Sequence, residues 1–365
     1  MELAGKPSRF GKHHNAFGFL RLLFASLVIV SHVPEIIDVG PQREILHRLT
    51  GTITFGNFAV YGFFVISGYL ITGSLLGSNS IAAYARKRAA RIYPGFAAAS
   101  LVCLLVVAPL SGAAFSGPAW RTAAISVVRI VLLARPVAEH PFAGQTYSGD
   151  AVGLNGAMWT IQYEAACYAV VVLLMVMGLL RNRWLTPALA AALILIGTFG
   201  ENHLPWWLSH GILFPGAPDQ IFTLSGIFLA GASFYLYRDE IGFRPALVCL
   251  CAALFVATLF DRHTVAFGYA IFGSYLIFAA AKAGAGNWIG RINDRNDVSY
   301  GVYLYAWPAE QLLIRYFGTR HLILLAVLTW IAAAIMGWIS WKIVESPALK
   351  LIGRSAPQKA PASGC

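Results

Sequence analysis

Near its start the chain carries the segment Leu20-Arg21-Leu22-Leu23-Phe24-Ala25-Ser26-Leu27-Val28-Ile29-Val30-Ser31-His32, an apolar run with two ionisable side chains. A helix rises about 1.5 Å per residue, so Arg21 and His32 are roughly 16 Å apart along the axis, about half of a bilayer core. Eleven residues make about three turns, so both side chains leave the helix on nearly the same side. Such groups usually face the protein interior or a wet cavity. The alternative is that Arg21 anchors the helix at the interface and a carbonyl group satisfies His32.

The overall composition is that of a polytopic membrane protein. Hydrophobic residues make up 58% of the 365 positions, charged residues make up 12%, and the mean hydropathy is +0.66. These values exclude an ordinary soluble enzyme. The net charge of +11 is expected to reflect basic cytoplasmic loops first and an anion site second. No basic domain stands outside the apolar segments, so we expect no nucleic-acid partner. The cysteines lack metal-ligand spacing, so we expect no metal and treat those in apolar runs as core residues.

Eleven apolar segments can be drawn, at 17–38, 54–76, 93–112, 122–134, 158–180, 184–200, 219–237, 245–260, 264–281, 298–316 and 321–344. The segment 122–134 is too short for an untilted span and contains Arg129, so we expect it to lie in the interface or to fold back. The other ten predict two termini on one side of the membrane. In that arrangement 19 of the 27 Lys and Arg residues lie on the side of the termini, which places both termini in the cytoplasm.

The predicted fold is therefore all-α, a polytopic integral membrane bundle of about ten transmembrane helices. We expect one transmembrane domain over residues 1–350, followed by a short disordered cytoplasmic tail over 351–365.

Two segments offer groups that suit a ligand. Ser67 and Gly68 put a hydroxyl and a site of close helix approach inside the second span, and a purely packing role is the alternative. Arg86-Lys87-Arg88-Ala89-Ala90-Arg91 puts four cations into six residues at the cytoplasmic entry of the third span. Arginine forks suit phosphate oxygens, although lipid headgroups or simple orientation of the chain explain the same residues.

The segment that contains Trp159 and Glu164 enters a span from the far side. Counted from Met158, Glu164 lies about 9 Å deep, and His32 lies about as deep below the far end of the first span. We therefore expect the Glu164 carboxylate to lie beside the His32 imidazole and to orient it. A structural glutamate bonded to aromatic side chains or backbone is the alternative.

Two C-terminal segments complete the candidate residues. Tyr300, Tyr303 and Trp307 share one helical face, as packing aromatics also do. The Val344-Glu345-Ser346-Pro347 segment is expected to end a helix.

Together these stretches resemble the membrane-bound acyltransferase-3 family, which O-acylates bacterial surface carbohydrates and related acceptors. The matching motifs are Arg21 with His32, Phe63-Phe64-x-x-Ser67-Gly68, Arg88-x-x-Arg91-Ile92-Tyr93-Pro94, Trp159-x-x-x-x-Glu164, Ser299-Tyr300…Tyr303-Leu304 and Val344-Glu345-x-Pro347. The chain departs from the family at Ala306, where members often carry histidine before Trp-Pro.

The resemblance implies an O-acyltransferase that uses cytosolic acyl-CoA, most simply acetyl-CoA, without a metal. It implies that His32 is catalytic, as a general base oriented by Glu164 or as the site of an acyl-histidine. We expect the CoA phosphates to be held by Arg21, Arg86, Arg88 and Arg91. Substrate contacts are expected from Ser67, Trp159 and Tyr300.

The expected acceptor is a hydroxyl of a bacterial exopolysaccharide, a lipopolysaccharide O-antigen or a lipid-linked glycan at the inner membrane. A small-molecule or lipid acceptor is the first alternative. A proton-coupled transporter with His32 and Glu164 as a relay is the second. Membrane lipid is an expected partner, and a second copy in a homodimer is compatible with the sequence.

Overall fold

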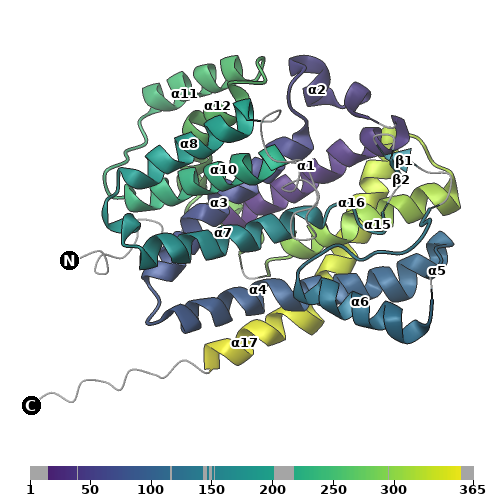
Figure 1. The fold of residues 1–365 in the computed structure, drawn as a ribbon. Helices are drawn as coiled ribbons and strands as arrows, with labels where there is room; N and C mark the ends of the chain where they lie inside the picture. The colour runs from purple at the N-terminus through teal and green to yellow at the C-terminus, as the bar shows by residue number, and fades with distance from the viewer. Residues whose placement is uncertain are drawn as a thin grey trace, which may run out of the picture.

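The computed structural model describes residues 15–38, 40–115, 117–142, 146–147, 150–151, 153–200, 218–294 and 296–354, and most of these are helical (Figure 1). The helices are α1 (Phe17–Asp38), η1 (Pro41–Arg43), α2 (Ile45–Thr50), α3 (Phe55–Leu76), α4 (Ile81–Val102), η2 (Cys103–Val107), α5 (Ala108–Ser111), α6 (Ala119–Val131), α7 (Trp159–Val176), η3 (Leu179–Arg181), α8 (Leu185–Phe199), α10 (Pro218–Leu236), α11 (Pro245–Thr258), α12 (Val265–Gly268), η4 (Tyr269–Gly273), α13 (Ser274–Ala283), α14 (Trp288–Arg291), α15 (Ser299–Phe317), α16 (Leu322–Ser340), η5 (Trp341–Glu345) and α17 (Ser346–Arg354). Strands β1 (Thr146–Tyr147) and β2 (Asp150–Ala151) form a small antiparallel hairpin.

Each of the eleven predicted apolar segments coincides with helix in the structure. The largest difference in bounds is at the third, where α4 begins twelve residues before the predicted start, at Ile81. Ser80 caps this helix by accepting a hydrogen bond from the backbone N–H of Ala83 at 3.1 Å. The basic cluster around Arg88 is therefore helical, because the helix begins at its cap and not where the apolar run begins.

The helix stop predicted at Val344–Pro347 is wrong. The chain passes from α16 through one π-helical turn, η5, directly into α17. Pro347 lies just after this π-helical turn; because proline lacks the N–H that would bond back into the turn, it removes one helical hydrogen bond without ending the helix. Helix continues to Arg354, past the predicted domain boundary at residue 350, and residues 355–365 of the predicted tail lie outside the described residues.

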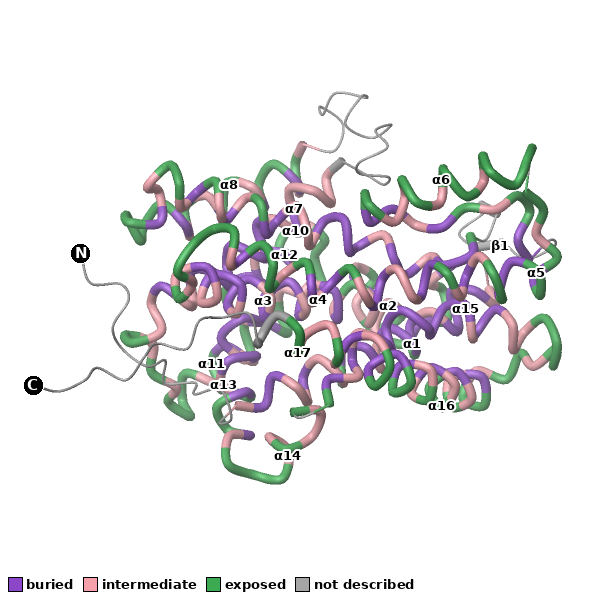
Figure 2. The backbone as a smooth tube through the Cα atoms, turned by 90° about the horizontal axis from the view of Figure 1, so that it is seen from below, coloured by how far each residue is buried: buried purple, intermediate pink, exposed green. Residues whose placement is uncertain are grey.

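The bundle has the character of a multi-pass membrane protein. Six helical segments in the described ranges are long and apolar enough to cross a bilayer: Phe17–Asp38, Phe55–Leu76, Ile81–Ser111, Trp159–Val176, Val265–Ala283 and Leu322–Leu351. Shorter apolar helices accompany them at Leu185–Phe199 and Pro245–Thr258. The count of ten spans and the cytoplasmic termini stay predictions. Helix α6, from the short segment 122–134, has no buried residue and runs along the edge of the molecule (Figure 2).

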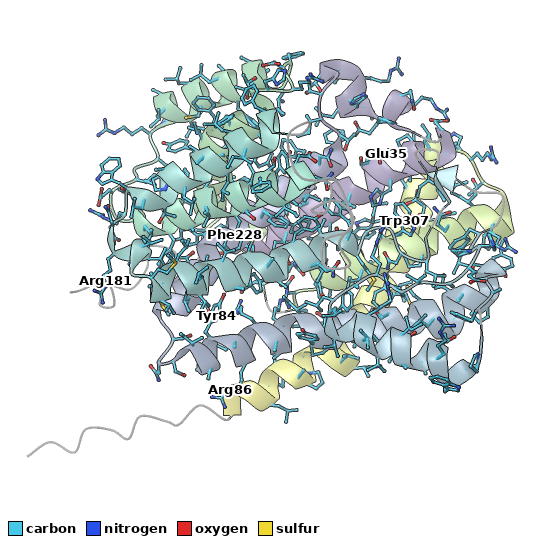
Figure 3. The ribbon with its side chains drawn as sticks, in the orientation of Figure 1. Glu35, Tyr84, Arg86, Arg181, Phe228 and Trp307 are labelled. Carbon is cyan, nitrogen blue, oxygen red and sulfur yellow. The ribbon has the colours of Figure 1, made fainter. Side chains whose placement is uncertain are left out.

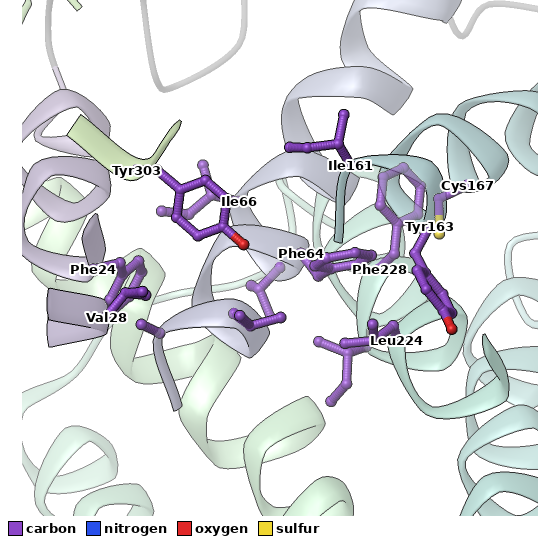
Figure 4. Packing of buried hydrophobic residues seen from close by; sticks show 14 of the residues in the cluster. Phe24, Val28, Phe64, Ile66, Ile161, Tyr163, Cys167, Leu224, Phe228 and Tyr303 are labelled. Carbon is purple, nitrogen blue, oxygen red and sulfur yellow. The ribbon is translucent and has the colours of Figure 1, made fainter. Parts of the chain in front are cut away.

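Helices α1 and α15 form the centre of the bundle. Helix α1 packs against α3, α15 and α16, while α10 packs between α8 and α3. Figure 2 shows α1 and α15 largely buried, in contrast to the exposed outer helices. One continuous apolar cluster joins these elements, and Figure 4 shows part of it, with Phe24, Phe64 and Phe228 among the buried side chains. Of the predicted core cysteines, Cys103, Cys167 and Cys251 are buried, whereas Cys249 is exposed on α11.

The crossing of α3 and α10 depends on two glycines. A Cβ atom on Gly68 would lie 1.9 Å from the carbonyl oxygen of Phe228, and one on Gly231 would lie 2.0 Å from that of Val65. Any side chain at either position would force the helices apart. The close helix approach predicted at the Ser67-Gly68 pair is confirmed.

We predict that Gly231→Val separates α3 from α10 and destabilises the protein, because overpacking of this kind typically costs about 1–3 kcal/mol. The measurement is the apparent melting temperature of the detergent-purified protein. Gly242→Val is the matched control, since a Cβ at Gly242 meets no atom within 4 Å. An unchanged melting temperature for Gly231→Val would contradict the close crossing.

Candidate active site

A polar cavity lies between helices α1, α3, α4, α7 and α15. Its volume is about 120 Å³. Its polar lining consists of Arg21, Ser67, Arg88, Arg91, Thr160, Glu164, Tyr168, Ser299, Tyr300 and Tyr303. The apolar lining comes mostly from α3, with Phe63, Phe64 and Ile66 among its residues. Six of the nine residues predicted from the sequence lie here: Arg21, Ser67, Arg88, Arg91, Glu164 and Tyr300.

Asp297 joins two of the three arginines. Its Oδ2 lies 2.5 Å from a terminal nitrogen of Arg21 and also pairs with Arg91. Its Oδ1 accepts hydrogen bonds from Ser299 Oγ at 2.5 Å and from Asn293 Nδ2 at 2.9 Å. Burial alone would raise the pKa of Asp297, but the two guanidinium groups and these hydrogen bonds hold it well below its usual range. We call Arg21, Arg91 and Asp297 the arginine clasp.

Arg91 has further neighbours at the end of α16. One of its terminal nitrogens is 3.9 Å from Glu345, and its guanidinium lies 5.9 Å from the ring centre of Tyr300 and 5.8 Å from that of Trp341. Glu345 accepts a hydrogen bond from Ser340 at 3.0 Å. The π-helical turn η5 spans Trp341 and Glu345 and so presents both to Arg91. Arg91 is thus held from two directions.

Arg88 differs from the other two cavity arginines. It makes no ion pair with a described residue, and its buried Nε has no hydrogen-bond partner there. Arg88 is three residues before Arg91 on α4, so both project from neighbouring positions into the cavity. The cavity therefore holds two arginines that share one carboxylate, and a third, Arg88, that makes no ion pair with a described residue.

Glu164 lies in the cavity and not beside His32, so the predicted pairing of these two residues is wrong. Its Oε1 accepts hydrogen bonds from Ser67 Oγ at 2.8 Å and from the Tyr168 hydroxyl at 2.7 Å. Two aromatic pairs join α1 to α3: Phe17 with Tyr69, and Phe24 with Phe63. The ring centres of each pair are 5.7 Å apart. Ser67 therefore lies at the same depth in the bundle as Arg21. Glu164, which is hydrogen-bonded to Ser67, lies at that depth too. His32 lies eleven residues further along α1, roughly 16 Å away.

Glu164 lies deeper than the sequence predicts, because the chain is already buried in the protein before α7 begins. Leu154, Asn155 and Met158 are already buried ahead of the first turn. The Asn155 amide donates a hydrogen bond of 2.7 Å to the carbonyl of Leu304, in the second turn of α15. The chain thus enters the protein as an irregular segment, and α7 starts well inside it. A depth counted from Met158 therefore places Glu164 too near the far surface of the membrane.

His32 contacts Trp307 instead. The two rings meet edge to face at 4.9 Å between centres, and His32 Nδ1 is buried without a hydrogen-bond partner in the described chain. Trp307 follows Tyr303 by one turn of α15, and Tyr303 lines the cavity. Tyr303 shares a hydrogen bond of 2.7 Å with Thr160, which is also part of the lining. His32 is therefore about one helical turn beyond the end of the cavity, and the expectation that Arg21 and His32 both line it is wrong.

Two other predicted residues lie outside the cavity lining. Arg86 is exposed on α4, while Trp159 packs against Tyr163 with 5.3 Å between ring centres. The sequence reasoning missed Asp297, Thr160 and Tyr168 as site residues, and it named Tyr303 only as a neighbour of Tyr300 on one helical face. Asp297 had one available signal, since it is an acidic residue two positions before Ser299 of the Ser299-Tyr300 motif, in a loop that also contains basic residues. Among the described residues no cluster of three or more His, Cys, Asp or Glu side chains could hold a metal ion.

Comparison with known proteins agrees with this architecture. The family model described as "Acyltransferase domain" matches residues 14–341, nearly the whole chain. The chain belongs to this acyltransferase family. It is similar to a protein of Shigella phage Sf6 named "O-acetyl transferase", with 27% identity over 94% of this chain and 98% of the relative. It is also similar to "Nodulation protein 10" of Rhizobium leguminosarum bv. viciae, with 26% identity over 93% of this chain and 94% of the relative. No solved structure matches the chain.

The family assignment and the fold together identify a multi-pass membrane O-acyltransferase. They confirm the resemblance and the enzyme class predicted from the sequence. The cavity of this acyltransferase has a cationic wall from α1 and α4 and an apolar wall from α3.

We predict that Asp297→Asn destabilises the acyltransferase, because it leaves Arg21 and Arg91 without their shared counter-charge. A fully buried pair would lose about 3–5 kcal/mol, and the partial exposure of both arginines reduces this to roughly 2 kcal/mol. The measurement is the apparent melting temperature in detergent. Asp239→Asn is the control, because Asp239 is exposed and lies 3.8 Å from Arg238.

The pH dependence follows from the lowered pKa of Asp297. A carboxylate with a depressed folded-state pKa stabilises fully above its unfolded pKa of about 3.9 and loses that contribution as the pH falls below it. The stability difference between wild type and Asp297→Asn should therefore stay constant between about pH 5.5 and 8.5. A difference that shrinks within this window would mean that Asp297 titrates there and that the clasp is not an ion pair.

Proposed function

We propose that this acyltransferase moves an acetyl group from cytosolic acetyl-CoA to a hydroxyl of a bacterial surface carbohydrate. The acceptor would be an exopolysaccharide, a lipopolysaccharide O-antigen or a lipid-linked glycan at the inner membrane. One observation carries the proposal: a cavity with an unpaired arginine at one end stops one helical turn short of an unpartnered histidine. The phage relative named "O-acetyl transferase" supports the choice of an acetyl group.

Arg88 is proposed as the first anchor for a CoA phosphate. Arg21 and Arg91 already share Asp297, so an incoming anion gains less from them than from Arg88. Arg86 is exposed just outside the cavity and would add only screened attraction. The pantetheine arm, which is mostly uncharged, would then lie along the apolar α3 wall of Phe63, Phe64 and Ile66.

His32 is proposed as the general base. A neutral imidazole takes the proton of the acceptor hydroxyl while its oxygen attacks the thioester carbonyl, the carbon–sulfur bond breaks, and the proton passes to the leaving thiolate. The reacting carbonyl must therefore pass Tyr303 to reach His32. Glu164 accepts hydrogen bonds from Ser67 and Tyr168, and its proposed role is to hold these two side chains at the cavity wall.

We predict that Arg88→Ala weakens CoA binding about tenfold or more, because a charge-assisted contact to phosphate is worth roughly 1.5–3 kcal/mol. The measurement is the rise in melting temperature of the purified protein on titration with CoA. Arg86→Ala is the matched control, two residues away on the same helix but exposed. Equal losses for the two variants would show that general positive charge, and not the cavity, binds the nucleotide.

We predict that His32→Ala abolishes acetyl transfer while leaving expression and CoA-dependent stabilisation intact. The direct test of the function compares surface glycans of cells with wild-type protein, His32→Ala or no gene, by the mass of one acetyl group. Near wild-type transfer by purified His32→Ala would contradict the mechanism. A burst of CoA release without acceptor, present in wild type and absent in His32→Ala, would identify an acyl-histidine intermediate in place of a general base.

A further inference from the structure

Helix α15 contains a proline, and a side chain from a distant part of the chain uses the carbonyl group that this proline leaves free. In a regular helix the carbonyl of Leu304 would accept a hydrogen bond from the N–H of the residue four positions later. That residue is Pro308, which has no N–H. The Asn155 amide takes its place, since its Nδ2 donates a hydrogen bond of 2.7 Å to the Leu304 oxygen. Asn155 is 1% exposed, so this bond is shielded from water.

Asn155 belongs to a short irregular segment, residues 153–158, which we call the strap. The strap begins at the surface, where Gly153 is exposed, and leads directly into α7. Two side chains of α15 donate hydrogen bonds to its backbone. The Tyr303 hydroxyl reaches the carbonyl of Ala157 at 2.6 Å, and Trp307 Nε1 reaches the carbonyl of Gly153 at 3.3 Å. Together with the Asn155 amide, these bonds tie the strap to α15 at three points.

A glycine lets the strap lie directly against the Trp307 ring. A Cβ atom on Gly156 would lie 2.5 Å from Cζ2 of this ring, so any larger residue would push the strap and the ring apart. The same indole meets the His32 imidazole edge to face, with 4.9 Å between ring centres and 86° between the ring planes. Trp307 is therefore in contact with the strap and with His32 at once.

The structure gives the His32 imidazole a ring neighbour in place of a carboxylate. Its buried Nδ1 has no hydrogen-bond partner among the described residues, and Glu164 is bonded instead to Ser67 and Tyr168. A general base must be held in one orientation, because a small misplacement of the reacting groups removes much of the rate. The contact with Trp307 supplies this constraint.

We propose that the strap positions His32 through Trp307, with the Asn155 amide as the latch that fastens the strap to α15. This inference rests on the proposed function, in which His32 is the base, and makes Asn155 and Trp307 positioning residues. Figure 3 shows Trp307 toward the end of the bundle that lies away from Arg86 and Arg181. Loss of the latch should therefore lower kcat without weakening the binding of acetyl-CoA.

The test measures acetyl transfer by the purified full-length protein to the surface polysaccharide of cells that lack the gene. For Asn155→Ala we expect kcat to fall about tenfold or more, because the base is displaced, with the KM for acetyl-CoA unchanged. Asn287→Ala is the matched control. The Asn287 amide also donates to a helix carbonyl, that of Ala283 at 3.0 Å, but at an exposed site where water can replace it.

A double variant separates positioning from stability. Asn155→Ala leaves the buried Leu304 carbonyl without a donor, which lowers the melting temperature. Adding Pro308→Ala restores the backbone N–H that a regular helix would offer to this carbonyl. The double variant should therefore regain melting temperature while its kcat stays low, because the strap is still unlatched. Recovery of kcat together with the melting temperature would show that Asn155 only satisfies a carbonyl, and would overturn the proposal.

A chemical probe tests the strap without any acceptor. Diethyl pyrocarbonate modifies neutral histidine side chains that it can reach, and mass spectrometry of the His32 peptide gives the rate at this residue. We expect His32 to react about tenfold faster in Asn155→Ala than in wild type, the factor of one buried hydrogen bond, and at the wild-type rate in Asn287→Ala. Trp307→Phe, which removes the N–H that reaches Gly153 but keeps an aromatic ring, should show the same faster labelling.

An unchanged labelling rate in Asn155→Ala and Trp307→Phe would mean that the strap does not hold Trp307 against His32, and the proposal would fall. Failure of wild type to transfer acetyl would instead overturn the proposed function. The labelling of His32 would still decide whether the strap controls this residue, so the two failures are distinguishable.

Discussion

The site depends on one carboxylate. Asp297 is buried between two arginines that come from α1 and α4, and it stands in the loop that leads into α15. Three segments far apart in the sequence are therefore fixed at one point by charge neutralisation. Without Asp297, two guanidinium groups would face each other inside the bundle at a large electrostatic cost. With it, the arginines are held in place and the third, Arg88, is left to meet an anion.

Two chemically different regions result, one on each side of Tyr303. Arginine and apolar side chains surround the first, which suits a phosphorylated donor with a long uncharged arm. The second contains buried polar groups without hydrogen-bond partners among the described residues, such as those of Glu310 and Gln311. His32 lies between them against Trp307.

The sequence predicted the helices well and the pairing of side chains less well. Apolar runs locate helices because the bilayer imposes length and hydropathy on them, and all eleven runs proved helical. Arg21, Ser67, Arg88, Arg91, Glu164 and Tyr300 do share one cavity. The predicted pairing of Glu164 with His32 is wrong because the sequence places the start of α7 at the membrane surface, whereas this helix begins inside the protein. Asp297 could not be recognised, since one carboxylate in a loop of mixed charge has no distinctive spacing, and its role appears only when α1, α4 and α15 meet.

The most direct test of this account is a cryo-electron microscopy structure of the protein with bound CoA. The account predicts a phosphate group at Arg88, the Arg21–Asp297–Arg91 clasp intact, and the thiol end directed past Tyr303 toward His32. A CoA molecule bound with its phosphates away from Arg88, or with its thiol directed away from His32, would contradict it.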